Sequence, residues 1–221
     1  MGLFVLSLAL VSCGNQQSKS NNPKTLDSAD QKTTTVVKEQ KNILFFGTSL
    51  TAGYGLDPTE AYPALIQNRI DSLKMPYKVI NGGLSGETSA GGKGRIDWLL
   101  KQRVDVFVLE LGANDGLRGL PVAQTIKNLQ DIIDRVKTKY PDAKMVLAGM
   151  QVPPNMGAKY ASDFKNIFPD LAKKNQMALI PFLLDKVGGI PKLNQADGIH
   201  PTAEGDKILA ENVWAVLKAL L

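Results

Sequence analysis

Three side chains in this sequence have the types and spacing needed for nucleophilic cleavage of an ester. Ser49 follows an apolar run, Ile43 to Phe46, which predicts a short buried strand that ends in a turn at Gly47. His200 is the sole histidine, and Asp197 precedes it by three residues. A serine, a base that takes its proton and an acid that orients the base make a catalytic triad. Taken alone, the Asp-x-x-His spacing fits a helix cap beside a surface histidine equally well.

Two glycine-rich segments could supply donors for the oxyanion of such a reaction. Gly86 follows the second predicted strand, and its N–H has no side chain to obstruct it. Asn114 follows the third predicted strand, and its amide is a neutral donor. With the Ser49 N–H these would form a three-donor hole. Each residue alone is explained by turn geometry, but parallel strands would bring all of them to one edge of a sheet.

The rest of the sequence alternates between strand and helix patterns, with no hairpin signals. Five apolar runs predict strands at residues 43–46, 77–80, 104–111, 144–150 and 177–180. Helical spacing follows each of them, beginning near residues 60, 89, 121, 164 and 203. This order predicts an α/β domain with a parallel sheet covered on both faces.

Four blocks of sequence resemble, in the same order, the blocks of the GDSL-type SGNH hydrolase family. They are Gly47-Thr48-Ser49-Leu50, Gly86, Gly112-Ala113-Asn114-Asp115 and Asp197-Gly198-Ile199-His200-Pro201. The resemblance covers residues 42–221 and is closest to the bacterial esterases of this family that have thioesterase and lysophospholipase activity.

The resemblance implies a flavodoxin-like three-layer α/β/α sandwich, with five parallel strands in the order 2-1-3-4-5. It also implies Ser49 as nucleophile, His200 as base and Asp197 as its partner. The oxyanion hole would consist of the Ser49 and Gly86 amides and the Asn114 side chain. One position departs from the family pattern, because Thr48 stands where the family has Asp. We expect altered support of the turn rather than lost activity.

The substrate pocket is expected in the loop after the fourth predicted strand. This loop contains Met150, Val152, Met156 and Tyr160 among several prolines. In the family the corresponding loop helps to define the acyl pocket, and these side chains would favour an apolar acyl or aryl group. The alternative is that Met150 belongs to the core and the prolines only stiffen the loop.

The amino-terminal residues predict export and a lipid anchor. Residues 1–12 are an apolar run too short to span a bilayer, which needs about 20 residues, and they match a signal peptide. Leu10-Val11-Ser12-Cys13 resembles a bacterial lipobox, although no Lys or Arg precedes the run. The alternative is an ordinary signal peptide with a coincidental cysteine. We expect residues 13–41 to be a lipidated, disordered tether and residues 42–221 to be the hydrolase domain.

Composition argues against several other classes of protein. One histidine and one cysteine leave carboxylates as the main metal ligands, so we expect no metal and no cofactor. The segment from Glu87 to Gly94 lacks the first Gly and the final Ser or Thr of a phosphate-binding loop. The net charge is +5, but Lys and Arg are scattered among acids without forming a stripe. We therefore expect a solvated surface near an anionic membrane rather than a nucleic-acid partner.

Together these features predict a serine esterase that acts through an acyl-enzyme. Its substrates would be aryl or short-to-medium acyl esters, with acyl thioesters and lysophospholipids as further candidates. We expect a monomer, exported and anchored to a bacterial membrane through Cys13, facing the periplasm or the cell exterior. The alternatives are a carbohydrate O-deacetylase of the same fold and a binding lipoprotein without activity.

Overall fold

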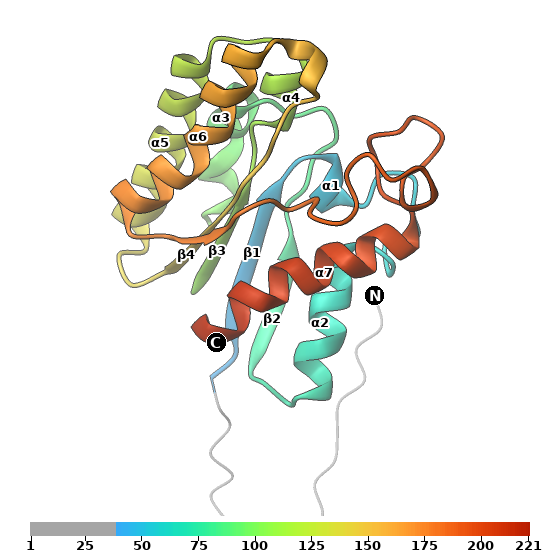
Figure 1. The fold of residues 1–221 in the computed structure, drawn as a ribbon. Coiled ribbons are helices and arrows are strands. Elements are labelled where there is room, and N and C mark those ends of the chain that lie inside the picture. Colours follow the sequence, from blue (N-terminus) through green and yellow to red (C-terminus); the bar gives the residue numbers. More distant parts are fainter. Residues whose placement is uncertain (1–38) are drawn as a thin grey trace, which may run out of the picture. The chain divides into compact units, whose positions relative to one another are not determined.

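Five parallel strands form the centre of the fold, in the order β2-β1-β3-β4-β5 (Figure 1). This computed structural model describes residues 39–221. The strands are β1 (Lys41–Gly47), β2 (Tyr77–Asn81), β3 (Val106–Glu110), β4 (Lys144–Ala148) and β5 (Ala178–Ile180). The predicted α/β class and strand order are confirmed. The predicted signal peptide, Cys13 and most of the predicted tether lie outside the described residues.

Five long helices cover the two faces of the sheet. On one face α2 (Tyr62–Ser72) packs beside α7 (Ala203–Leu217). The other face carries α3 (Ser89–Leu99), α5 (Val122–Lys139) and α6 (Ala158–Asn175), with α5 between its two neighbours. Short helices fill the connections: α1 (Ser49–Ala52), α4 (Ala113–Leu117), η1 (Pro154–Met156), η2 (Pro191–Leu193) and η3 (Lys218–Leu220).

The core explains why the central strands are apolar on both sides. Phe45, Phe46 and Phe107 are fully buried, because helices pack on both faces of β1 and β3. All buried apolar side chains of the described part come from residues 43–217. This part therefore contains a complete hydrophobic core of its own, as an independently folding domain does.

Several element ends differ from the predicted ones. Strand β1 begins at Lys41, inside the predicted tether, because the Lys41 N–H donates to Pro76 O at 2.8 Å. Helix α6 begins at Ala158, six residues before the predicted start. Helix α3 ends at Leu99 instead of near residue 103. The short helices α1 and α4 were not predicted, since four or five residues give no measurable periodicity.

The topology brings the candidate residues to one edge of the sheet. Ser49, Gly86 and Asn114 follow β1, β2 and β3, and Met150 follows β4, so all lie beyond the carboxyl ends of parallel strands. Ligands of open α/β sheets bind at this edge. No helix within residues 39–221 has the length and apolarity needed to cross a membrane.

Candidate active site

Ser49, His200 and Asp197 form a continuous chain of hydrogen bonds. Ser49 Oγ lies 2.9 Å from His200 Nε2, although 151 residues separate them in sequence. His200 Nδ1 lies 2.6 Å from Asp197 Oδ2. Ser49 is the first residue of α1, and His200 ends the loop before α7. The structure thus brings together the three side chains that the sequence singled out.

The loop around Asp197 is held by its own carboxylate. Asp197 Oδ1 accepts hydrogen bonds from the backbone N–H groups of Ile199 and His200, both at 3.0 Å. Gly198 allows this tight turn because its φ is +75°, a conformation that other residues rarely adopt. The hydrogen bond from His200, together with the two backbone bonds, lowers the pKa of Asp197 to about 2. The carboxylate is therefore ionised at any pH where an imidazole is neutral.

A second contact joins the histidine loop to the serine turn. The ring of Tyr54 lies 4.5 Å from the His200 ring, centroid to centroid. Gln195 Nε2 donates to Tyr54 O at 2.7 Å and to Pro201 O at 2.9 Å. Sequence reasoning missed both residues, because nothing in the local pattern of Tyr54 or Gln195 indicates a contact across 141 positions.

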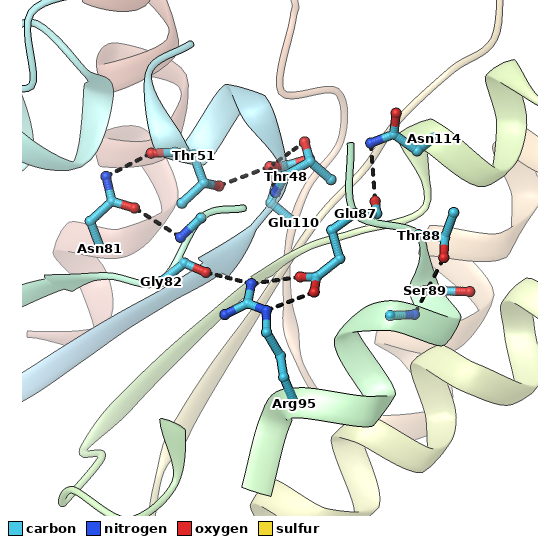
Figure 2. Close-up of polar contacts among 12 residues, drawn as sticks. Thr48, Thr51, Asn81, Gly82, Glu87, Thr88, Ser89, Arg95, Glu110 and Asn114 are labelled. Atoms are coloured by element: carbon cyan, nitrogen blue, oxygen red, sulfur yellow. Dashed lines mark hydrogen bonds and ion pairs between the residues drawn. The ribbon is translucent and has the colours of Figure 1, made fainter. Parts of the chain in front are cut away.

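The serine turn rests on a buried carboxylate, that of Glu110, at the end of β3 (Figure 2). The sheet register pairs Gly47 with Glu110 and so places this side chain under the turn. Glu110 accepts from Thr48 N–H at 2.8 Å, from Thr48 Oγ1 at 3.0 Å and from Thr51 Oγ1 at 2.8 Å. Tyr62 Oη is 2.7 Å from Thr51 Oγ1. We call Glu110, Thr48, Thr51 and Tyr62 the serine-turn cluster.

Burial dominates the electrostatics of the serine-turn cluster. Glu110 is fully buried, and this loss of solvent raises its pKa to about 7 against the opposing hydrogen bonds from Thr48 and Thr51. Gly47 is required here, because a Cβ on it would lie 2.5 Å from Glu110 Oε2 and 2.0 Å from Thr51 Oγ1. Glu110 was missed in the sequence, although an acid in an otherwise apolar strand was a signal available there.

The cluster also shows what Thr48 does in place of the family's aspartate. Its hydroxyl donates to the Glu110 carboxylate, and its backbone N–H donates to the same group. An aspartate at this position would face Glu110 with a second carboxyl group, and one of the two would have to hold a proton. The threonine supports the turn without adding a negative charge beside Ser49.

The candidate oxyanion donors line the same cavity as Ser49. Gly86 and Asn114 both lie on its wall. Asn114 Nδ2 donates one hydrogen to Glu87 O at 3.0 Å (Figure 2), so its second amide hydrogen remains for a ligand. Gly86 has φ +76°, and its carbonyl accepts from Arg118 Nη2 at 3.0 Å.

An ion pair fixes the segment that orients Asn114. Arg95 donates to both oxygens of Glu87, from Nε at 2.6 Å and from Nη2 at 2.5 Å (Figure 2). The same guanidinium donates to Gly82 O at 2.7 Å and lies 4.5 Å from the centre of the Phe46 ring. Bidentate pairs of this kind restrict geometry strongly. The Glu87 carbonyl that receives the Asn114 amide is therefore held in place.

The cavity in front of Ser49 has a volume of about 630 Å³. Met150 and Val152, two of the four residues that the sequence placed in the substrate loop, form part of its lining. Met156 and Tyr160 do not line it. The Tyr160 hydroxyl donates to Leu120 O at 2.8 Å, and its ring stacks on Phe164. Further apolar side chains that the sequence did not indicate complete the lining: Leu50, Leu117, Phe182, Leu184 and Ile199.

Within residues 39–221, no group of three or more His, Cys, Asp or Glu residues is arranged to hold a metal ion. The groups around Ser49 are instead a hydroxyl, an imidazole paired with a carboxylate, and neutral donors. This set suits acyl transfer.

Comparison with known proteins identifies the family. Residues 45–208 match the model of the GDSL-like lipase/acylhydrolase family. The chain belongs to this family. It is 41% identical over 182 residues to esterase TesA of Pseudomonas aeruginosa, covering 82% of this chain and 90% of TesA. It is 38% identical over 180 residues to thioesterase 1/protease 1/lysophospholipase L1 of Escherichia coli, covering 81% and 84%.

Other relatives agree with this assignment. The arylesterase of Vibrio mimicus is 37% identical over 174 residues, covering 78% of this chain and 86% of its own. A crystal structure of TesA matches with a TM-score of 0.78, at 41% identity, over 82% of this chain and all of the other. Esterase EstA of Pseudoalteromonas, solved with monoethylphosphonate as inhibitor, matches with a TM-score of 0.77 at 31% identity, over 82% and 98%.

The protein is therefore an esterase, a carboxylic ester hydrolase of the GDSL-like family. Its α/β fold is that of the solved relatives. The site described above lies within the matched residues, with Ser49 near their beginning and His200 near their end.

Proposed function

We propose that Ser49 is the nucleophile of this esterase, His200 its base and Asp197 the residue that orients the base. The observation that carries this proposal is the hydrogen-bonded chain from Ser49 Oγ through the imidazole to the Asp197 carboxylate, at the wall of an apolar cavity. Because Nδ1 carries the imidazole hydrogen and donates it to the Asp197 carboxylate, Nε2 faces Ser49 as an acceptor.

The reaction proceeds in two halves. Ser49 Oγ attacks the ester carbonyl carbon while its proton moves to His200 Nε2, and the carbonyl oxygen becomes an oxyanion. The tetrahedral intermediate then breaks the bond to the alcohol oxygen, which takes the proton from Nε2 and leaves. Water then attacks the acyl carbon while one of its protons moves to Nε2. The second tetrahedral intermediate breaks the bond to Ser49 Oγ, which takes this proton back from Nε2, and the acid is released.

The oxyanion is stabilised by three donors: the N–H groups of Ser49 and Gly86 and the free hydrogen of Asn114 Nδ2. All three residues line the same cavity. Preorganised donors of this kind contribute strongly to acyl transfer because they need no rearrangement in the transition state.

The substrates we propose are aryl esters and short-to-medium acyl esters, with acyl thioesters and lysophospholipids as further candidates. A volume of about 630 Å³ with mainly apolar side chains suits an acyl chain or an aromatic ring. The relatives carry the names esterase, arylesterase and thioesterase/lysophospholipase. No observation favours carbohydrate O-deacetylation, since Ser85 and Gln151 are the main polar lining side chains outside the proposed catalytic groups.

The rates for p-nitrophenyl acetate, butyrate and octanoate test this substrate class. We expect kcat/KM to rise from acetate toward octanoate, because each added methylene contributes about 0.8 kcal/mol when buried. Leu184 lines the cavity and takes no part in the hydrogen-bonded chain of Ser49, His200 and Asp197, so Leu184→Trp should narrow the cavity. This variant should lower kcat/KM for octanoate by about tenfold or more and leave acetate within about twofold. A flat profile that Leu184→Trp does not change would contradict the apolar acyl pocket.

We also propose that the protein is exported and anchored through a lipid on Cys13, as a monomer. The support is the lipobox-like sequence Leu10 to Cys13 and the polar composition of residues 14–41. Metabolic labelling with a radioactive fatty acid tests the anchor. The parent should incorporate label and partition with membranes, whereas Cys13→Ser should do neither; label retained in Cys13→Ser would refute it.

A further inference from the structure

The fold separates charge in a way that the sequence does not reveal. We define the amino-end edge as the side of the sheet where the strands begin and the long helices end, together with the connecting loops. Arg103 at this edge pairs with Glu39 and Asp105. The remaining exposed acids there are Asp71, Asp97, Asp134, Asp142 and Asp170, of which Asp97 pairs with Arg135, and the carboxylate of Leu221 is half-buried. They face nine exposed lysines: Lys41, Lys74, Lys78, Lys101, Lys139, Lys144, Lys173, Lys174 and Lys218.

The opposite edge, which carries the proposed catalytic groups, is balanced. Its exposed acids are Asp57, Glu60, Asp163, Asp185, Asp197 and Glu204, and its exposed bases are Arg118, Lys159, Lys186, Lys192 and Lys207. The lysines that seemed scattered in the sequence are therefore gathered by the topology at one end of the domain, far from the substrate cavity.

Helix dipoles explain only part of this distribution. Cations are favoured in the last turn of a helix, and Lys139, Lys173 and Lys174 occupy such positions. Lys41 and Lys144, in contrast, are the first residues of strands β1 and β4, where no helix dipole favours a cation. The excess of lysines at this edge thus needs a further reason.

The same edge exposes the two least covered large apolar side chains of the described residues. Trp98, in the last turn of α3, is 67% exposed, and Leu73, just after α2, is 56% exposed. The exposed Tyr54, Leu84 and Ile199 instead lie in loops at the catalytic edge, and the exposed Leu117 ends α4 there. Tryptophan beside basic residues is typical of a surface that meets lipid headgroups.

A membrane fits this surface better than a small anion does. The lysines spread along a whole edge, as a plane of headgroups requires. A cavity of about 490 Å³ at this edge has Lys137, Lys144 and Lys174 in its lining. Only Lys144 and Lys174 of the nine exposed lysines line this cavity. A single phosphate bound there would leave the other seven lysines without a partner.

The position of the anchor agrees with a membrane. The described chain enters the fold at this edge, where Lys41 begins β1 (Figure 1). Cys13, the proposed lipidation site, precedes Lys41 by 28 residues (41 minus 13). The disordered tether expected from the sequence would span about 30 Å on average at that length, so the proposed anchor would hold the domain close to the bilayer. At physiological salt, charges act over only about 8 Å, which requires the lysines to touch the surface.

We propose that the amino-end edge docks on anionic phospholipid headgroups, with Trp98 at the interface and the catalytic cavity turned toward the aqueous side. The location at a membrane rests on the proposed anchor, whereas affinity of this edge for anionic lipid does not. The esterase would then take its substrates from solution rather than from the bilayer beneath it.

The test uses residues 39–221, which contain the complete core, so that no lipid anchor contributes. Binding is measured by co-sedimentation with vesicles of phosphatidylcholine, with or without phosphatidylglycerol. We expect binding only to the anionic vesicles, weakening as salt rises from about 50 mM to about 300 mM. Neutralising Lys101, Lys139, Lys173 and Lys174 to Gln should reduce the affinity by about tenfold or more.

The matched control neutralises four lysines at the catalytic edge, Lys159, Lys186, Lys192 and Lys207, to Gln. It has the same net charge as the first variant and should bind within about twofold of the parent. Hydrolysis of p-nitrophenyl butyrate in the same samples verifies that both variants are folded and separates a docking failure from a catalytic one. Equal loss in the two variants, or binding to dextran sulfate without binding to vesicles, would overturn the proposal.

Fluorescence provides a second readout, because Trp98 and Trp214 are the only tryptophans in the chain. In Trp214→Phe, anionic vesicles should shift the Trp98 emission to shorter wavelength, as an indole does when it leaves water. Trp98→Phe should show no such shift. A shift from Trp214 with none from Trp98 would refute the proposed orientation.

Discussion

Asp197→Asn is expected to lower kcat for p-nitrophenyl butyrate by about 10³- to 10⁴-fold with little change in KM. The asparagine Oδ1 can still accept from the Ile199 and His200 N–H groups, so the turn survives. Its Nδ2 would meet His200 Nδ1 as a donor and force the hydrogen onto Nε2, which faces Ser49. The imidazole then cannot accept the serine proton. KM should stay close to that of the parent, because Asp197 does not line the cavity.

The matched control for this variant is Asp185→Asn, which removes an exposed acid from the same edge of the sheet. It should keep kcat within about twofold of the parent, as most surface substitutions do. A loss below about tenfold in Asp197→Asn, or a loss that appears entirely in KM, would show that the carboxylate does not orient the base.

Glu110→Gln should remove much of the pH dependence of folding stability. Burial raises the folded pKa of Glu110 to about 7 from an ordinary 4.5, so the folded state holds this proton more tightly than the unfolded chain. Its contribution to stability is fully present below pH 4.5 and is lost as the pH rises through about 7. The shift corresponds to about 3 kcal/mol. The glutamine amide is neutral at every pH and keeps the shape.

Urea denaturation at pH 5 and pH 8 measures this effect. The parent should lose stability between the two values, and Glu110→Gln should lose about 3 kcal/mol less. Asp206 contributes to the pH dependence of stability that remains in Glu110→Gln, because burial also raises the pKa of Asp206 to about 7. Its carboxylate accepts a hydrogen bond from Tyr62 N–H at 3.1 Å. The exposed control Asp170→Asn should behave as the parent. An unchanged slope in Glu110→Gln would show that the buried carboxylate is not the titrating group.

Asp197 could be singled out from the sequence, whereas the role of Glu110 could not. Asp197 and His200 are close in sequence and lie in one loop, so their spacing, taken together with the other three sequence blocks, indicated a partnership with a distant serine. Glu110 acts through the register of β1 with β3, which places it opposite Gly47. That register cannot be read from either strand separately. An acid within an apolar strand nevertheless indicated that a buried polar partner exists. The local pattern did not show that the partners were Thr48 and Thr51.

The residues that line the cavity were harder still to predict from the sequence. Met150 and Val152 could be predicted, because the loop after a strand's carboxyl end faces the site. Three other lining residues come from two different segments: Phe182, Leu184 and Ile199. The local sequence does not tell whether an apolar loop residue lines a cavity or packs in the core. Tyr160 was assigned to the pocket for its type, but its hydroxyl binds Leu120 O and its ring packs inward.

The fold class and strand order followed from the alternation of apolar runs with helical spacing and from the resemblance to the family. The first and last residues of the helices and strands were harder to predict, because they depend on contacts across the fold. Lys41 joins β1 only through its bond to Pro76, and Arg103 leaves α3 to pair with Glu39 and Asp105. The lysine-rich edge depends on the same kind of information, since its members come from separate segments.

Covalent labelling of Ser49 by an ethyl fluorophosphonate tests the central claim most directly. The reagent reacts with a serine oxygen only when a neighbouring base activates it, and the related esterase EstA was solved with monoethylphosphonate as inhibitor. We expect mass spectrometry of the inactivated protein to find one adduct, on the peptide that contains Ser49. Ser49→Ala should take up no label and hydrolyse no ester. An adduct on another residue, or ester hydrolysis by Ser49→Ala at the parent's rate, would contradict the account.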